Sequence, residues 1–146
     1  MATLLVDAPP SDPTRVTAGC VVAGRYRVEK LIGAGGFAHV FRAQHAGTGQ
    51  PVALKVLASQ GADTDNQLKR FFREARVTAG LRHPNTIRVF DFGMEDDGTV
   101  YLAMEMLSGQ TLKGDLQSRM QHRKVFTEEE VIRIASTITR SLGEAH

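Results

Sequence analysis

The feature that most constrains the fold is a glycine-rich turn between two stretches of alternating apolar and polar residues. Residues 26–32 alternate in this way, residues 33–36 interrupt the pattern, and residues 39–44 resume it. Alternation with a period of two is typical of a half-buried strand. A short turn between neighbouring strands makes them antiparallel. The sequence therefore predicts a β-hairpin whose turn is rich in glycine.

The rest of the apolar pattern predicts a small antiparallel sheet with a helix beside it. Further strands are predicted by alternation, and they span residues 51–57, 86–92 and 99–106. Between the first two of these, apolar residues at helical spacing predict a basic helix over residues 66–81, which Pro84 keeps from continuing. The expected fold class is therefore α+β, with a five-stranded antiparallel sheet.

The last part of the chain changes to helical periodicity. A helix is expected over residues 111–120, although Gly114 weakens it. Thr127 and Glu130 have the spacing of a capping box, so a second helix is expected to begin there and to run close to His146. The apolar stripe of this second helix comprises Val131, Ile134, Ile138 and Leu142. An exposed stripe of that length favours association, either with another polypeptide or between copies of the chain.

Composition and charge exclude several classes of protein. The 18 Lys and Arg residues exceed the 16 Asp and Glu residues by only two, which argues against a nucleic-acid-binding protein. Cys20 is the single cysteine, so an intrachain disulfide is impossible and a reducing cytoplasm is expected. No segment approaches the roughly 18 consecutive apolar residues of a membrane span. Pro9, Pro10 and Pro13 predict a flexible leader over residues 1–18.

Basic residues cluster on the first predicted helix and in the segment after it. They are Lys69, Arg70, Arg73, Arg76, Arg82 and Arg88. A nucleic-acid site would require exposed aromatic residues between them, and the sequence offers none there. The cluster is therefore expected to be a solvated face, with no nucleic acid as a partner.

The glycine-rich turn is compatible with two kinds of phosphate site. Gly33 and Gly35 begin a G-x-G-x-x-G pattern whose third glycine is replaced by Ala38. In a dinucleotide-binding protein such a turn leads from a strand into a helix, whose N-terminus holds the phosphate. Here the turn leads into a strand, which excludes that arrangement. A glycine hairpin between antiparallel strands instead allows backbone amides to cover a triphosphate.

Two charged residues stand out from their surroundings. Lys55 lies in an otherwise apolar strand, and a buried ammonium group needs an anionic partner. The alternative for Lys55 is an edge position that faces water. Glu74 lies on the basic helix, 19 residues after Lys55 (74 − 55). The alternative for Glu74 is a solvated side chain that forms local ion pairs with Arg73 and Arg76.

In combination, these motifs resemble the small lobe of a eukaryotic-like protein kinase of the bacterial serine/threonine type. The resemblance covers roughly residues 18–146 and rests on the segments GRYRVEKLIGAGGFAHVF, VALKVL, RFFREARVTAGLRHPNTIRVFDFG and YLAMEMLSGQTL. A glycine loop, a strand Lys, a helix Glu, an HPN turn and a hinge strand follow one another in the family's order. The resemblance implies that residues 19–107 form the ATP-binding small lobe, and that residues 108–146 form the first two helices of an incomplete large lobe.

The resemblance also implies roles for individual residues. Lys55 would contact the α- and β-phosphates of ATP and pair with Glu74. The glycine loop would cover the phosphates, and it comprises Gly33, Ala34, Gly35, Gly36, Phe37 at its tip and Ala38. The adenine would lie under an apolar roof, beside a gatekeeper methionine, with its edge bound to the hinge backbone. These adenine contacts would come from Ile32, Val40, Ala53, Met104 and the backbone of Glu105 and Leu107.

Two tripeptides look like catalytic motifs. Asp91-Phe92-Gly93 spells the family's magnesium motif but precedes the hinge strand, so a strand position is expected instead of a metal ligand. His122-Arg123-Lys124 begins like the HRD catalytic loop, yet it has Lys124 where the catalytic Asp is needed. The Asn of that loop is also missing, because Asn66 and Asn85 are the only asparagines.

The residues that perform phosphoryl transfer are expected outside the chain. A kinase needs an Asp that orients the substrate hydroxyl, and an Asp and an Asn that hold Mg²⁺. The resemblance places all three beyond His146, so neither catalytic residues nor metal ligands are expected within the chain. The complete enzyme would transfer the γ-phosphate of ATP, with Mg²⁺, to Ser or Thr of a protein substrate. The chain alone is expected to be inactive, and the missing large lobe or another chain to cover its last helix.

A second function is compatible with the same residues. The chain is alternatively a non-catalytic kinase-like module that regulates a full-length kinase through its small lobe. Lys55 and Glu74 argue against this alternative, because a pure interaction module does not need that pair.

Overall fold

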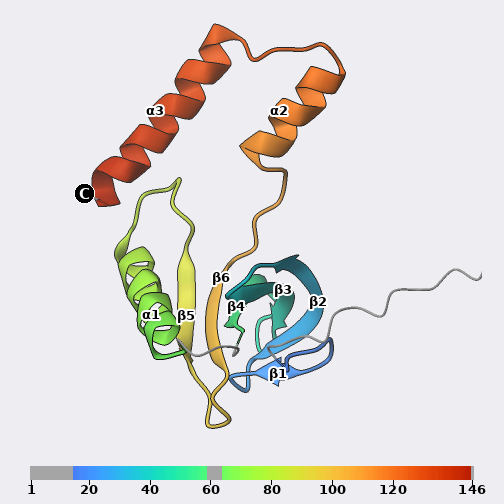
Figure 1. The fold of residues 1–146 in the computed structure, drawn as a ribbon, viewed down its shortest axis with the longest axis vertical. Coiled ribbons are helices and arrows are strands. Elements are labelled where there is room, and N and C mark those ends of the chain that lie inside the picture. The colour runs from blue at the N-terminus through green and yellow to red at the C-terminus, as the bar shows by residue number, and fades with distance from the viewer. Residues whose placement is uncertain (1–14, 59–63, 146) are drawn as a thin grey trace, which may run out of the picture.

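The computed structural model describes residues 15–58 and 64–145, in which one curled antiparallel sheet is joined by three helices (Figure 1). β1 (Val21–Val22), β2 (Tyr26–Ala34), β3 (Ala38–His45) and β4 (Pro51–Leu57) precede α1 (Thr64–Gly80), and β5 (Val89–Met94) and β6 (Val100–Glu105) follow it. The strands lie side by side in the order β1-β2-β3-β4-β6-β5. α2 (Leu112–Gln121) and α3 (Glu128–Ala145) form a helical hairpin that stands away from the sheet.

The expected α+β fold class is confirmed, although the sheet has one strand more than the five predicted. The additional strand, β1, has only two residues, and an alternation pattern needs more than two to be visible. Residues 1–14 of the expected leader lie outside the described residues. Val16, which the sequence assigns to that leader, is only 5% exposed and packs into the core.

Several element boundaries differ from the predicted ones by a few residues, and two of these differences have a local cause. α1 ends at Gly80, before Pro84 can act, because glycine is a poor helix former and the Leu81 N–H already donates to the Thr78 carbonyl three residues back. β5 begins at Val89 instead of Thr86. The Thr86 N–H donates to the carbonyl of His83, so this segment forms a turn before the strand starts.

The caps of the last two helices follow the sequence. Thr111 Oγ1 accepts a hydrogen bond from the Gly114 N–H at 3.1 Å, which places the glycine in the first turn of α2, where it does little harm. The predicted capping box of α3 is confirmed. The Glu130 N–H donates to Thr127 Oγ1 at 3.2 Å, and the Thr127 N–H donates to Glu130 Oε2 at 2.8 Å.

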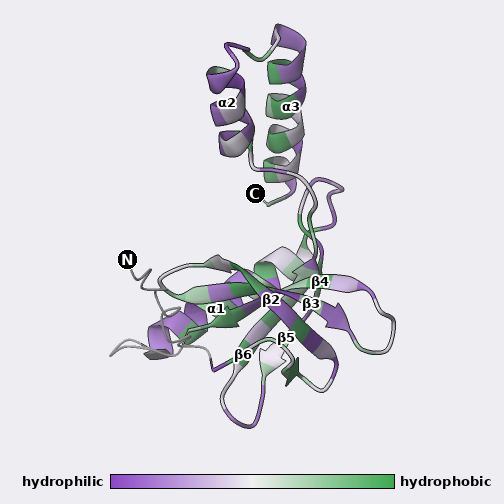
Figure 2. Cartoon of the chain, turned by 90° about the vertical axis from the view of Figure 1, so that its right-hand side faces the viewer, coloured by the Kyte–Doolittle hydropathy of each residue, from purple (hydrophilic) through white to green (hydrophobic). Residues whose placement is uncertain are grey.

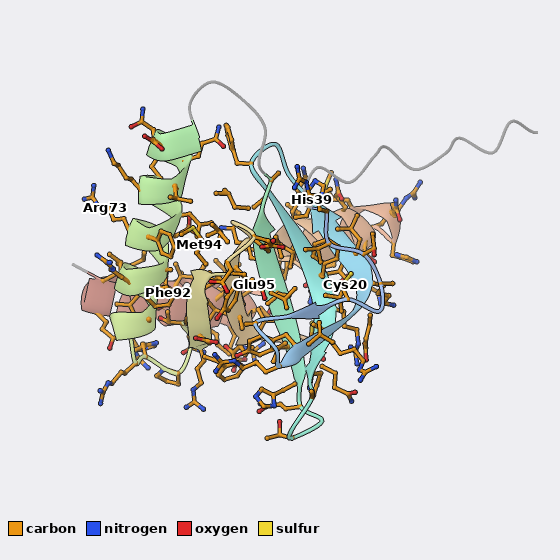
Figure 3. The ribbon with its side chains drawn as sticks, turned by 90° about the horizontal axis from the view of Figure 1, so that it is seen from below. Cys20, His39, Arg73, Phe92, Met94 and Glu95 are labelled. Atoms are coloured by element: carbon orange, nitrogen blue, oxygen red, sulfur yellow. The ribbon has the colours of Figure 1, made fainter. Side chains whose placement is uncertain are left out.

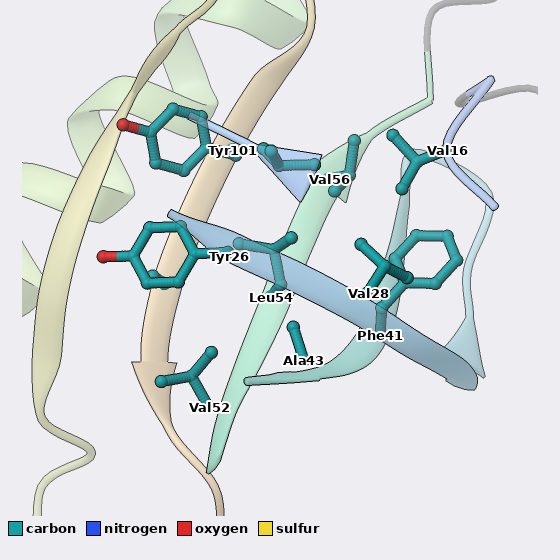
Figure 4. Close-up of a cluster of buried hydrophobic side chains, with 11 residues drawn as sticks. Val16, Tyr26, Val28, Phe41, Ala43, Val52, Leu54, Val56 and Tyr101 are labelled. Atoms are coloured by element: carbon teal, nitrogen blue, oxygen red, sulfur yellow. The ribbon is translucent and has the colours of Figure 1, made fainter. Parts of the chain in front are cut away.

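The apolar core has two parts, one on each face of the sheet. The first lies inside the curl and includes the fully buried Leu54 and Val56 of β4 (Figure 4). The second lies between the sheet and α1, where Phe71 and Ala75 pack on Leu102 of β6. The central strand β4 therefore contributes to both parts, and α1 is held on the sheet by apolar burial.

Two carboxylates join the edges of the curled sheet. Asp91 of β5 accepts hydrogen bonds from the hydroxyls of Tyr26, at 3.3 Å, and Tyr101, at 3.1 Å. Glu95, just after β5, accepts a hydrogen bond from the Ala23 N–H beside β1 at 2.8 Å (Figure 3). β1 and β5 are opposite edges of the sheet order, so these side chains close the curl where backbone pairing does not. Burial, together with the charge of Asp91, raises the pKa of Tyr26 to about 12, which keeps its hydroxyl protonated as a donor.

Three of the four residues in the predicted apolar stripe of α3 are exposed, and the fourth, Ile134, is half-buried. No residue of α3 is buried, and Val131, Ile138 and Leu142 are each about half exposed. Figure 2 shows hydrophobic residues recurring along this helix. Among the described residues, no helix combines the length and the apolar character that crossing a membrane requires.

Replacing Asp91 with alanine is expected to lower the free energy of unfolding by about 1–3 kcal/mol, because two part-buried tyrosine hydroxyls lose their acceptor. Urea unfolding followed by circular dichroism measures this change. Asp96→Ala is the matched control, since Asp96 is exposed in the β5–β6 loop, and it is expected to change stability by less than about 0.5 kcal/mol. Equal losses in the two variants would contradict the role of Asp91.

Candidate functional site

Lys55 projects from the central strand of the sheet toward α1. Side chains alternate along β4, so Leu54 and Val56 enter the core inside the curl while Lys55 shares the opposite face with Leu57. β4 has β3 on one side and β6 on the other, so the alternative of an edge position is wrong. The Lys55 side chain is 24% exposed, which leaves its ammonium group part-buried and in need of a partner.

Glu74 of α1 is that partner. Lys55 Nζ lies 2.9 Å from Glu74 Oε1, within the range of a charge-assisted hydrogen bond. The ammonium also lies 5.7 Å from the ring centre of Phe71, one turn earlier on α1. The Glu74 carboxylate thus binds Lys55 of the sheet, and the alternative of local ion pairs with Arg73 and Arg76 is wrong.

Apolar packing on the same side of α1 places Glu74 at this distance. Ala75 is fully buried, and its small side chain allows the helix to approach the sheet closely. The ring of Phe72 lies 6.3 Å from that of Phe92, and Figure 3 shows Phe92 on β5 beside α1. Ala75 is next to Glu74 in the sequence, and Phe72 is two residues before it. The packing of these two residues therefore also sets the position of the Glu74 carboxylate.

The glycine-rich turn forms the predicted hairpin between β2 and β3. Gly33 is paired with Val40 and Ala34 with His39, so the strands continue into the glycine segment. The Gly35 N–H donates to the Ala38 carbonyl at 3.0 Å and closes the turn. The tip is fastened to the end of β4 because the Ala58 N–H donates to the Phe37 carbonyl at 2.9 Å.

A cleft of about 190 Å³ lies between this turn, β4 and α1. Its lining includes Lys55 and Glu74, and it is completed by Phe37, Ala38, Leu57, Gln67, Arg70 and Phe71. Gln67 was not predicted as a cleft residue, and Arg70 was predicted only as part of a solvated face, although they lie seven and four residues before Glu74 and so on the same helical face. The ammonium and guanidinium groups make this cleft suitable for an anion.

Three of the residues expected around an adenine, Val40, Ala53 and Met104, lie on the Lys55 face of the sheet. Val40 is the cross-strand partner of Lys55, and Ala53 is the partner of Met104. Cross-strand partners share a face, so these side chains form one surface with Lys55. Ile32 is 43% exposed, and Leu107, after β6, is 64% exposed. The structure therefore brings together a polar end at Lys55 and an apolar end at Met104, and their roles toward a nucleotide stay predictions.

The two tripeptides that resemble catalytic motifs have structural roles. Asp91 lies on β5, as expected, and its carboxylate accepts the tyrosine hydrogen bonds described above. His122 is the C-cap of α2, with Nδ1 at 2.7 Å from the Ser118 carbonyl, and Arg123 follows with a φ of 52° in the turn toward α3. Neither tripeptide contributes to the lining of the cleft that holds Lys55 and Glu74.

The basic residues of α1 and the following segment are all exposed. Figure 3 shows Arg73 projecting from α1 away from the sheet. This exposure fits the expected solvated face, except that Arg70 also lines the cleft beside Lys55.

Comparisons with known proteins agree with this arrangement. Residues 26–146 match the family model described as "Protein kinase domain". Curated relatives include the serine/threonine-protein kinase pkn3 of Myxococcus xanthus, which is 40% identical over 128 residues, 88% of this chain and 23% of the relative. The serine/threonine-protein kinase PrkC of Bacillus subtilis is 34% identical over 126 residues, 86% of this chain and 18% of the relative.

Solved structures give the same result for the fold. A crystal structure of the Mycobacterium tuberculosis PknI kinase domain is similar with a TM-score of 0.73 and 32% identity, over 90% of this chain and 51% of that chain. The chain thus spans less than a quarter of the length of pkn3 or PrkC and about half of the PknI kinase domain.

Glu74→Gln is expected to change the free energy of unfolding by less than about 1 kcal/mol, because the Glu74 side chain is 60% exposed and such ion pairs contribute little to stability. Thermal and urea unfolding measure this change. A loss several times larger would show that the pair holds the fold together, and would contradict the assignment of α1 seating to apolar packing.

Proposed function

The chain belongs to the protein kinase family, and on that premise we propose that it is the ATP-binding part of a serine/threonine kinase domain. The observation that carries the proposal is the 2.9 Å pair between Lys55 and Glu74, in a cleft roofed by the glycine hairpin. Lys55 binds the α- and β-phosphates of ATP, and Glu74 orients its ammonium group. The backbone of the hairpin, from Gly33 to Ala38, covers the phosphates.

The adenine end of the proposed site lies toward β6. Val40 and Ala53 share a sheet face with Lys55, and with Ile32 they form the apolar roof over the base. Met104 lies opposite Ala53 and limits the depth of the pocket. The backbone of Glu105 and Leu107 hydrogen-bonds the adenine edge, which fixes the base relative to the phosphates.

We assign the other half of the chemistry to the rest of a kinase domain. Kinases hold Mg²⁺ with an Asp and an Asn and orient the acceptor hydroxyl with a second Asp. Within residues 15–58 and 64–145, no group of three or more His, Cys, Asp or Glu side chains could hold a metal ion. In this proposal the chain binds and orients ATP, and transfer to a protein Ser or Thr requires the rest of a kinase domain.

The exposed stripe of α3 supports this division of tasks. Val131, Ile138 and Leu142 are each about half exposed, as expected for a helix whose cover belongs to another part of the domain. The proposed cover is the remainder of the kinase large lobe or a second chain that supplies it.

ATP is expected to bind the chain with a dissociation constant well above the micromolar range, because only one side of the nucleotide has a wall. Lys55→Met is expected to weaken this binding about tenfold, through loss of a charged hydrogen bond to phosphate. Titration with ATP, followed by amide NMR shifts at residues 33–38 and 53–55, measures both affinities. Lys113→Met, at an exposed lysine of α2, is the control and should bind like the parent. Equal affinities of the Lys55→Met variant and the parent would refute the proposed phosphate contact.

No Lys55-dependent phosphoryl transfer is expected from the purified chain, because the sequence has Lys124 where an HRD catalytic loop has its Asp, and no Asn follows it. Incubation with γ-labelled ATP and a generic Ser/Thr protein substrate measures transfer, with Lys55→Met as the background. Transfer by the parent above that background would contradict the expected inactivity.

A further inference from the structure

We propose that the outer face of α1 binds the surface of an anionic lipid bilayer. The binding face is a row of three cationic side chains, Lys69, Arg73 and Arg76, called the cationic stripe below. The contact is peripheral, so the chain lies on the bilayer surface without crossing it. The inference goes beyond the proposed function, because it involves neither ATP nor the pair of Lys55 and Glu74.

The three cations of the stripe lie on one side of α1. Arg73 follows Lys69 by four residues and Arg76 follows Arg73 by three, a spacing that brings side chains to the same helical face. From Lys69 to Arg76 the helix rises by about 10 Å. All three residues are exposed, and Figure 3 shows Arg73 projecting away from the sheet. α1 therefore presents a row of positive charges to its surroundings.

The charges of the stripe are not balanced by carboxylates. Between Thr64 and Gly80 the only acidic residues are Asp65 and Glu74, and Glu74 binds Lys55. Within residues 15–58 and 64–145, none of the ion pairs includes a member of the stripe. Like charges three and four residues apart destabilise a helix. A layer of anions over the stripe relieves this repulsion, so an anionic surface stabilises α1 as it binds.

Apolar side chains lie beside these cations. A shallow groove of about 490 Å³ follows this side of the helix, and it is lined by Leu68, Lys69, Phe72, Arg73, Arg76 and Val77. Val77 is 56% exposed. Cationic and apolar side chains on one exposed face match the boundary of a bilayer, where charged head groups adjoin acyl chains. Long Lys and Arg side chains reach the head groups while their apolar stems and Val77 contact the layer beneath.

The shape of the groove favours a bilayer over an acidic protein segment. All of its lining residues belong to α1, so it lacks the second wall against which a groove-bound peptide packs. A flat surface contacts the side of a single helix along its length and needs no second wall. Each Lys or Arg near an anionic leaflet adds to the attraction. Three cations in a row therefore give reversible, salt-sensitive binding.

Binding through the stripe leaves the cleft beside Lys55 open. On α1 the cleft is lined by Gln67, Arg70, Phe71 and Glu74, none of which lines the groove of the stripe. The two sets of residues lie on different sides of the helix. A bilayer bound to the stripe therefore orients the molecule without covering its cleft.

The first test is sedimentation of the whole chain with lipid vesicles at low ionic strength, without nucleotide. The parent is expected to bind vesicles of phosphatidylcholine with phosphatidylglycerol, and not vesicles of phosphatidylcholine alone. The combined variant Lys69→Gln, Arg73→Gln and Arg76→Gln is expected to bind about a hundredfold more weakly, because each cation contributes about fivefold. An ionic strength of about 1 M, at which the Debye length is about 3 Å, is expected to release the parent.

A matched control removes three exposed cations elsewhere on the chain. It combines Lys113→Gln, Lys124→Gln and Arg133→Gln, which change the net charge by the same amount. This variant is expected to bind within a few-fold of the parent, which separates the stripe from overall charge. The stripe variant is expected to unfold at no lower urea concentration than the parent, because it removes like-charge repulsion. Urea unfolding therefore shows that any loss of binding is not a loss of fold.

The second test locates the contact while the stripe stays intact. The chain contains no tryptophan, so Val77→Trp places a single indole beside the stripe. Its fluorescence emission is expected to shift to the blue with the phosphatidylglycerol vesicles, because indole rings settle at the bilayer interface. Val125→Trp is the control, since Val125 is 83% exposed in the segment between α2 and α3, and it is expected to show no shift.

Three outcomes would overturn the proposal. The first is equal vesicle binding by the stripe variant and the control variant. The second is a blue shift of Val125→Trp as large as that of Val77→Trp. The third is a response of Val77→Trp to poly-glutamate but not to vesicles, which would assign the stripe to an acidic protein segment. None of these measurements uses nucleotide, so failure of this proposal and failure of the proposed function remain distinguishable.

Discussion

The ammonium group of Lys55, part-buried on the central strand, is the constraint on which the rest of the site depends. β4 has neighbours on both sides and apolar residues on both faces, so a cation there needs an anionic partner. α1 supplies the carboxylate of Glu74, and its burial of Phe71 and Ala75 determines how near that carboxylate comes. The pair adds little stability because Glu74 is largely exposed. Its value lies in presenting a fixed positive charge to the cleft.

Carboxylates also connect separate strands, helices and loops elsewhere in the molecule. Asp91 and Glu95 connect the edges of the curled sheet, Glu105 ties β5 to β6, and Glu144 ties α3 to the loop after α1. In three of these contacts the donor is a backbone N–H, which a carboxylate can bind at short distance. Asp91 also shows why a motif needs its context. The tripeptide Asp91-Phe92-Gly93 lies on a strand beside two tyrosine hydroxyls, and its surroundings determine its task.

Periodic segments could be predicted from the sequence, and contacts between distant segments could not. Alternation identified β2, β3 and β4, helical spacing identified α1 and α3, and the capping box of Thr127 and Glu130 was confirmed atom by atom. β1 was not predicted because a strand of two residues shows no alternation pattern. The burial of Val16 was not predicted because a single apolar residue shows no pattern either. The order of motifs along the chain pointed to Lys55 and Glu74. Nothing local marked Glu144, whose partners lie 62 and 61 residues away.

The helical hairpin is held in place by few contacts, and their chemistry explains how it is oriented. No residue of α2 or α3 is buried, so the hydrophobic effect contributes little to its position in this chain. Its orientation follows from the covalent link after β6 and from the hydrogen bonds of Ser141 and Glu144, which are directional and short. Val131, Ile138 and Leu142 of α3 are therefore exposed in this chain. On the same helix, Ser141 and Glu144 form hydrogen bonds with the loop after α1.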